Sequence, residues 1–160
     1  QKGEDPREEF ETSIEININA YIPPKYIEDE MQKLEIYKKI ALIQNQEDYN
    51  DTQEEIEDRY GDLPQSVQNL LDVALIKATA HDIGLLSVTV RASEVIFLCK
   101  RDAKLDPTKI PSLLELYKDN LKFTGASEPY FTLKNKYKNP VKIVSYIKNV
   151  LQDMKKLKYR

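Results

Sequence analysis

Hydrophobic and polar residues alternate near the start of the chain. Residues 13–19, SIEININ, place Ile14, Ile16 and Ile18 on one side, and this period of two predicts a β-strand with one buried face. Pro23-Pro24 follows shortly afterwards and ends the extended segment, because proline cannot donate to a strand ladder.

A helical period replaces this alternation in residues 27–44. We expect one apolar stripe of that helix to be buried, with Tyr37 half-buried beside it and its hydroxyl hydrogen-bonded or in water. The stripe consists of Ile27, Met31, Leu34, Ile40 and Leu42 or Ile43.

Two further helices are predicted in the first half of the chain. After a polar break at residues 45–50, Asp51 or Thr52 is the expected N-cap of a short helix that ends at Gly61 in the left-handed conformation. A third helix begins near Pro64 and ends at Gly84. Its buried stripe is Val67, Leu70, Leu71, Ala74, Leu75 and Ala78.

β-Branched and aromatic residues dominate after Gly84. Residues 85–91 and 94–99 predict a hairpin that turns at Ala92-Ser93, and residues 110–119 predict a helix. Two short strands, 121–124 and 129–134, and a final helix over residues 140–157 follow. The final helix has the apolar seam Val144, Ile147, Leu151 and Met154.

The predicted order is strand, three helices, two strands, helix, two strands, helix. This order is typical of an α+β fold in which helices pack on a small, mainly antiparallel sheet. Residues 13–160 are expected to form one domain, and the polar, acidic residues 1–12 a linker that enters it. The chain begins at Gln1 without a methionine or an apolar signal segment, so we expect it to be part of a longer protein.

Composition limits the chemistry that the chain can perform. With 160 residues, one cysteine, one histidine and four glycines, it lacks the parts of a disulfide framework, a Cys/His zinc site or a glycine-rich phosphate loop. Cys99 is expected to be a buried, unreactive thiol, and His81 to pack near the end of the third helix. No apolar run is long enough to span a membrane, and a single cysteine suits a reducing compartment.

Charge is divided unevenly along the chain. Residues 1–62 contain 18 acidic and 7 basic residues, whereas residues 63–160 contain 9 acidic and 17 basic residues. Such a division is compatible with ordinary solvated helix faces, or with a different partner for each half.

The acidic residues concentrate in the second predicted helix. Glu55 and Asp58 are three residues apart and therefore share a face, with Glu54 beside them. A docking surface for a basic partner is the favoured interpretation, since nothing nearby in the sequence indicates a cleft. A small metal-dependent hydrolase that uses Glu54, Glu55 and Asp58 is the alternative from another class.

The basic residues concentrate at the other end. Residues 134–160 hold nine lysines or arginines against one acid, interleaved with Tyr137, Tyr146 and Tyr159. A DNA-binding accessory domain that uses this segment is therefore a second alternative. The apolar seam of the same helix argues against it, because a soluble helix needs polar residues on its remaining faces.

Three strings in the first half resemble a known family. They are YIPPKYI at residues 21–27, LEIYKKIA at residues 34–41, and EIEDRYGDLP at residues 55–64 followed by Leu70-Leu71. Their order and spacing are similar to the C-terminal domain of the bacterial transcription-repair coupling factor, the TRCF domain. The family usually has Arg where this chain has Lys33 and Lys39, a change that keeps the charge.

The resemblance implies a parent protein that is an ATP-driven DNA translocase, with ATP and Mg²⁺ in its motor domains. Such a parent displaces stalled RNA polymerase and recruits the excision-repair protein UvrA in the bacterial cytoplasm. Residues 1–12 would then be the linker from the translocase part.

The resemblance also implies the role of this domain. It would have no catalytic residues, cofactor or metal of its own, would pack on the UvrB-like N-terminal module of the parent, and would mask the surface that UvrA must reach. By position in the family motif, Glu55 and Asp58 would make that contact, with Glu54 and Arg59 beside them. Both Glu55 and Asp58 are expected to be exposed when the partner is absent.

Overall fold

A five-stranded sheet with helices on it forms the centre of the molecule. The structure is a computed structural model that describes residues 10–159. The strand order is β1-β2-β3-β5-β4; β1 pairs with β2 in parallel, and the other neighbours are antiparallel. This mixed but mainly antiparallel sheet confirms the predicted α+β class. The strands are β1 Ser13–Glu15, β2 Leu85–Val90, β3 Glu94–Cys99, β4 Leu121–Thr124 and β5 Tyr130–Lys134.

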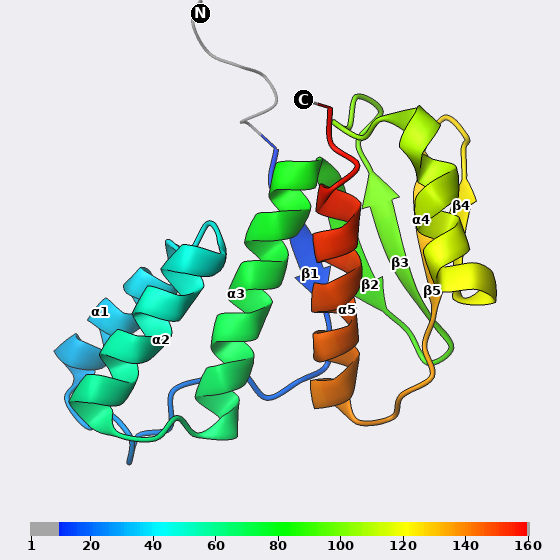
Figure 1. Ribbon diagram of the computed structural model, residues 1–160. Helices are drawn as coiled ribbons and strands as arrows, with labels where there is room; N and C mark the ends of the chain where they lie inside the picture. Colours follow the sequence, from blue (N-terminus) through cyan, green and yellow to red (C-terminus); the bar gives the residue numbers. More distant parts are fainter. Residues whose placement is uncertain (1–9, 160) are drawn as a thin grey trace, which may run out of the picture.

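The helices occupy two positions relative to this sheet (Figure 1). Helices α3 and α5 lie side by side in front of the sheet, α4 lies beside β4, and α1 and α2 pack on the other side of α3, away from the strands. The helices are α1 Glu30–Ala41, α2 Gln46–Tyr60, α3 Gln65–Ile83, α4 Ile110–Tyr117 and α5 Pro140–Lys155, with short 3₁₀ turns η2 Pro107–Lys109 and η3 Lys118–Asn120. The predicted order of elements is therefore confirmed.

Two hydrophobic cores follow from this arrangement, and α3 belongs to both. The sheet core surrounds Phe97 and Phe131 and includes the predicted α5 seam. The helical core lies between α1, α2 and the first half of α3, around Ile36, Ile56 and Leu71.

The N-terminal boundary differs in detail from the prediction. Residues 1–9 of the predicted linker lie outside the described residues. Packing on the domain begins before Ser13, because Thr12 is buried and its hydroxyl donates to the carbonyl of Leu85 at 2.7 Å. Strand β1 ends at Glu15, but Ile16 and Ile18 still pack against the sheet core.

The predicted buried stripe of the first helix is wrong at Met31 and Leu34, and of the two alternatives Leu42 and Ile43 it is Ile43 that is buried. Met31, Leu34 and Leu42 are exposed, whereas Ile36 and Ile40 form the buried side of α1. The helix begins only at Glu30, where the Asp29 carboxylate caps the N–H groups of residues 31 and 32. Ile27 is buried but precedes the helix, so its position does not define the helix's inner face.

The predicted start of the second helix is also wrong. Asn45, not Asp51 or Thr52, caps α2: its side chain accepts from the Asp48 N–H at 2.8 Å, and the Asp48 carboxylate accepts from the Gln44 N–H. This reciprocal pairing resembles a capping box and satisfies two free donors. Thr52 is buried within the helix.

The predicted end of α2 at Gly61 is confirmed, with a different backbone geometry. Gly61 has φ 92° and ψ −170°, a region that only glycine adopts readily, instead of the left-handed helical conformation. Gly84 ends α3 in the left-handed conformation, at φ 102° and ψ 29°.

Tyrosines of the three family strings tie these segments together. The Tyr37 hydroxyl accepts from the Ile22 N–H at 2.8 Å, which confirms its expected half-buried, hydrogen-bonded role. The Tyr26 hydroxyl donates to the Gly61 carbonyl, and the Tyr60 hydroxyl donates to Gln32 on α1. The strings therefore stabilise the packing of α1 on α2.

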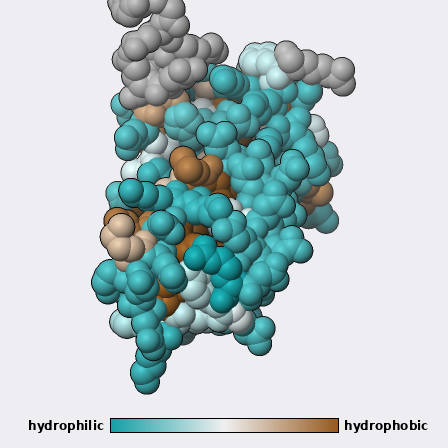
Figure 2. Space-filling view, turned by 90° about the vertical axis from the view of Figure 1, so that its left-hand side faces the viewer, coloured by the Kyte–Doolittle hydropathy of each residue, from teal (hydrophilic) through white to brown (hydrophobic). Residues whose placement is uncertain are grey.

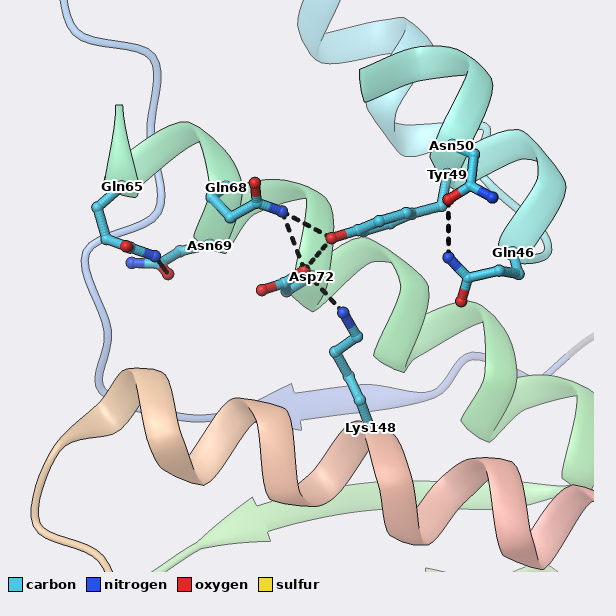
Figure 3. A network of polar contacts seen from close by, with 8 residues as sticks. All are labelled: Gln46, Tyr49, Asn50, Gln65, Gln68, Asn69, Asp72 and Lys148. Atoms are coloured by element: carbon cyan, nitrogen blue, oxygen red, sulfur yellow. Dashed lines mark hydrogen bonds and ion pairs between the residues drawn. The ribbon is translucent and has the colours of Figure 1, made fainter. Parts of the chain in front are cut away.

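A polar network joins the two groups of helices (Figure 3). The Asp72 carboxylate on α3 accepts from the Tyr49 hydroxyl of α2 at 2.5 Å and from the Lys148 ammonium of α5 at 3.1 Å. Gln68 donates to the Tyr49 oxygen at 2.6 Å, and the Lys148 ammonium lies 4.7 Å from the centre of the Tyr49 ring. Burial and the adjacent Asp72 carboxylate raise the pKa of Tyr49. The network holds α2 in a defined position relative to α3 and α5.

Candidate protein-docking site

The outward face of α2 carries a row of four carboxylates. They recur at helical spacing, and all four side chains are exposed: Glu47, Asp51, Glu54 and Asp58. Within residues 10–159, none of the four has a basic side chain within ion-pair distance. We call this row the acidic face of α2. It presents uncompensated negative charge to solvent.

Glu55 differs from the other predicted site residues. Its carboxylate lies 2.6 Å from the Lys39 ammonium of α1 and 3.7 Å from the Arg59 guanidinium, and the side chain is only 36% exposed. Glu55 is therefore paired and less exposed than expected, whereas Asp58 is exposed as expected. Sequence spacing could not reveal this, because Lys39 comes from another helix.

Arg59 is already engaged within the domain. Its guanidinium lies 5.0 Å from the centre of the Tyr60 ring in addition to its ion pair with Glu55. The neighbouring Tyr60 hydroxyl donates to Gln32 of α1. Because Lys39 and Arg59 neutralise Glu55, the available charge of this surface comes from the acidic face.

The geometry gives no support to a metal-dependent hydrolase. Among the described residues, no three His, Cys, Asp or Glu side chains are arranged to hold a metal ion. Glu54 and Asp58 lie along a convex helix surface, and a cavity of about 660 Å³ in the domain is lined by other residues, including Phe10, Asn45 and His81.

Several lysines of the basic C-terminal segment form ion pairs with carboxylates of the same domain. Lys148 binds Asp72, Lys156 binds Asp153 at 3.4 Å, and Lys158 binds Asp82 at 2.8 Å. These contacts reduce the positive charge that residues 134–159 could offer to a DNA backbone.

Cys99 and His81, the two remaining candidate residues from the sequence, have packing roles in the domain. Cys99 is buried, and burial raises the pKa of its thiol to about 12, so it is unreactive at neutral pH. The His81 ring stacks on Phe10 at 4.3 Å between centroids, and its Nε2 lies 3.1 Å from the Phe10 carbonyl oxygen. Across residues 10–159, no helix has the length and apolar character needed to cross a membrane.

Comparisons with known proteins agree with this geometry. The family model described as the TRCF domain matches residues 16–110. The transcription-repair-coupling factor of Bacillus subtilis is 39% identical over 82 residues, which are 51% of this chain and 7% of that protein. The transcription-repair-coupling factor of Myxococcus xanthus is 28% identical over 123 residues, which are 77% of this chain and 10% of that protein. The chain thus spans a tenth or less of these relatives.

A solved structure has the same fold. It is a crystal structure of the C-terminal domain of a transcription-repair coupling factor, and it superimposes with a TM-score of 0.79 over 92% of this chain and 95% of the other, at 23% identity. The match of the family model to more than half of the sequence, together with this fold, shows that the chain belongs to the TRCF domain family.

Proposed function

We propose that this chain is the regulatory C-terminal domain of a transcription-repair coupling factor and has no catalytic site of its own. The parent would be a bacterial, cytoplasmic, ATP-driven DNA translocase, with ATP and Mg²⁺ bound in its motor domains. It would remove stalled RNA polymerase from DNA and recruit UvrA. The membership of the chain in the TRCF family and the names of its relatives support a role in coupling transcription to repair.

The proposed docking role rests on the acidic face of α2. Its carboxylates have no basic partner in the described chain, and they lie on the side of α2 opposite the buried Ile56. Such a face would bind the basic surface of the parent's UvrB-like module and mask the surface that UvrA must reach. Charge-assisted hydrogen bonds between carboxylates and Arg or Lys are short and orientation-dependent, which suits a specific contact.

A modest intrinsic affinity suffices for such a mask. When two modules belong to one polypeptide, the second binds at an effective concentration that reaches the millimolar range for short linkers. An encounter with polymerase that favours the open state by a few kcal/mol would then be enough to expose the UvrA surface.

The test is the affinity of the full-length parent for UvrA at fixed salt. We expect the double change Glu54→Gln and Asp58→Asn to raise this affinity about tenfold or more, since each lost contact to a charged group is worth about 1.5–3 kcal/mol. Glu55→Gln should raise the affinity for UvrA by less, because Lys39 and Arg59 already bind that carboxylate.

The matched control removes two acids from a remote surface. Asp119→Asn with Glu128→Gln makes the same change in net charge at exposed positions outside α2, and it should leave UvrA affinity unchanged. Equal affinities for the α2 variant and the unmodified parent would reject the mask. Weaker UvrA binding by the α2 variant would mean that these carboxylates touch UvrA directly.

A further inference from the structure

The loop between β5 and α5 carries positive charge that the contacts within the domain do not use. Residues 129–152 contain five lysines and no acidic residue. Lys148 pairs with Asp72, but the other four lysines are exposed, and within residues 10–159 none of them has a carboxylate within ion-pair distance. They are Lys134, Lys136, Lys138 and Lys142. Their charge is therefore available to a partner.

A fifth cation is held beside this loop. The Asn135 N–H donates to the carbonyl of Ser93 at 3.0 Å, and the Asn135 side chain donates to the carbonyl of Arg91 at 2.8 Å. These bonds fix the loop against the β2–β3 turn, at one end of the sheet (Figure 1). The Arg91 side chain is exposed, and the turn contributes one carboxylate, Glu94, opposite Lys134 in the strand register. We call Arg91 and the four lysines the basic patch.

Folding alone gives no reason for this accumulation of charge. Lys142 lies in the first turn of α5, where the helix dipole favours acidic residues and none is present. The neighbouring turn η3 adds one lysine and one aspartate, Lys118 and Asp119, so it leaves the net charge of this end unchanged. Like charges that lie close together destabilise a compact fold. A bound anion would relieve this repulsion.

An exposed aromatic ring belongs to the same loop. Tyr137 stands between Lys136 and Lys138 in the sequence and is 38% exposed. Its ring packs at 5.5 Å between centroids on Tyr146 of α5 in a T-shaped arrangement, and Tyr146 in turn lies 6.4 Å from Tyr117 of α4. These contacts hold the Tyr137 ring in a defined orientation. A planar group that stacks on it therefore costs little further side-chain entropy.

We propose that the basic patch together with Tyr137 binds single-stranded nucleic acid. The lysines and Arg91 contact the phosphates of the backbone, and the Tyr137 ring stacks on a base. An acidic protein segment would neutralise the same cations but would give the aromatic ring no role. A duplex would offer phosphates, but its bases are already stacked on one another. A single strand is the partner that uses both features.

This surface is separate from the acidic face of α2. Helix α2 packs on the side of α3 that is away from the strands, whereas the basic patch lies at one end of the sheet (Figure 1). Figure 2 views the α1–α2 side and shows mainly hydrophilic side chains there, with fewer hydrophobic ones between them. The two surfaces share no residue, so the inference does not rest on the proposed function.

The assay is the fluorescence anisotropy of a labelled oligothymidine of about 12 nucleotides, titrated with the 160-residue chain. For single strands, the logarithm of the affinity falls with the logarithm of the salt concentration, with a slope of about −0.7 per neutralised phosphate. Four contacts therefore predict about 50-fold weaker binding at about 200 mM than at about 50 mM salt. In Lys136→Gln with Lys138→Gln, two contacts remain and the same increase in salt should weaken binding only about sevenfold.

The matched control removes two lysines at the other end of α5. Lys104 and Lys155 are exposed, have no ion pair among the described residues, and lie near the C-terminal end of that helix. Lys104→Gln with Lys155→Gln makes the same change in net charge and should keep the salt dependence of the unmodified chain.

Two substitutions test the ring of Tyr137. Tyr137→Phe keeps the aromatic plane and should keep the affinity for the oligothymidine. Tyr137→Leu keeps an apolar contact with Tyr146 but removes the stacking surface, so it should weaken binding about fivefold or more without changing the salt dependence. A duplex of the same length should bind more weakly than the single strand.

Several results would overturn the inference. The basic patch is not the site if the oligothymidine does not bind at millimolar chain concentration, or if the Lys104/Lys155 control reduces the salt dependence as much as the loop variant does. Equal affinities of the unmodified chain and Tyr137→Leu, or equally tight binding of the duplex, would exclude a single strand stacked on Tyr137. If polyglutamate displaces the oligothymidine at the same concentration of charge, the occupant is an acidic polypeptide and the inference fails. The affinity for UvrA after changing Glu54 and Asp58 tests the proposed function alone.

Discussion

The ion pair between Lys148 and Asp72 should contribute more to stability than any other lysine–carboxylate contact of the described chain. The Asp72 side chain is only 9% exposed, and that of Lys148 is 26% exposed. Lys148→Met keeps most of the apolar stem of the lysine but leaves a buried carboxylate without its cation. Complete burial would make this loss worth about 3–5 kcal/mol, and the partial exposure of Lys148 reduces our expectation to about 2 kcal/mol.

The assay is urea denaturation of the 160-residue chain. With a slope near 2 kcal/mol per molar urea, a loss of about 2 kcal/mol lowers the midpoint by about 1 M, and the slope itself should not change. Lys158→Met is the matched control. Its lysine is 25% exposed, but its partner Asp82 is 40% exposed, so we expect a loss of about 0.5 kcal/mol or less.

A second substitution tests whether the network acts as a unit. Tyr49→Phe removes one donor to Asp72 and should cost about 1–2 kcal/mol by itself. In the double variant, Asp72 retains only the Gln68 amide at 3.4 Å, so the combined loss should exceed the sum by about 0.5 kcal/mol or more. Equal midpoint shifts for Lys148→Met and Lys158→Met would refute the reasoning. The burial of the partner carboxylate would then not determine how much free energy of unfolding is lost when the lysine is removed.

Three other expectations concern single positions. Gly61→Ala should cost about 1–2 kcal/mol in urea melts from backbone strain alone, since no atom lies within 4 Å of the added Cβ; an unchanged midpoint would contradict this. Tyr37→Phe should cost about 1–2 kcal/mol, because the Ile22 N–H loses its acceptor, whereas the control Tyr21→Phe at an exposed ring should cost little. Burial raises the pKa of Cys99 from 9.0 to about 12, so the unfolded chain releases this proton first and the free energy of unfolding should fall between about pH 9 and 12; Cys99→Ala should show a shallower fall, and parallel profiles would be evidence against a buried thiol.

Local patterns in the sequence were enough to predict most elements of this fold. The hairpin over residues 85–99 and the seam of α5 depend on near-neighbour periodicity and on turn residues, which act within a few positions of the chain. Gly84 and Gly61 ended their helices as predicted, because a positive φ is a local requirement that glycine meets. The family strings likewise indicate the TRCF domain, because they lie within residues 16–110, which the family model matches.

The errors arose where a local pattern allowed two answers. Periodicity shows which residues of α1 share a face, but it does not show which face turns inward. Tertiary packing against α2 and α3 selected Ile36 and Ile40, and this selection placed Met31, Leu34 and Leu42 in solvent. Propensity in isolated segments is weak enough for such packing to decide.

The candidate site shows the same division. The sequence by itself determined that α2 is acidic, that Glu54 and Asp58 lie on it, and that the chain contains no strong catalytic motif. Only the tertiary structure decided that Glu55 pairs with Lys39, that Lys148 pairs with Asp72, and that Leu34 of α1 is exposed. The physical reason is that ion pairs and buried area depend on distances between segments up to 76 positions apart, and the folded chain alone sets those distances.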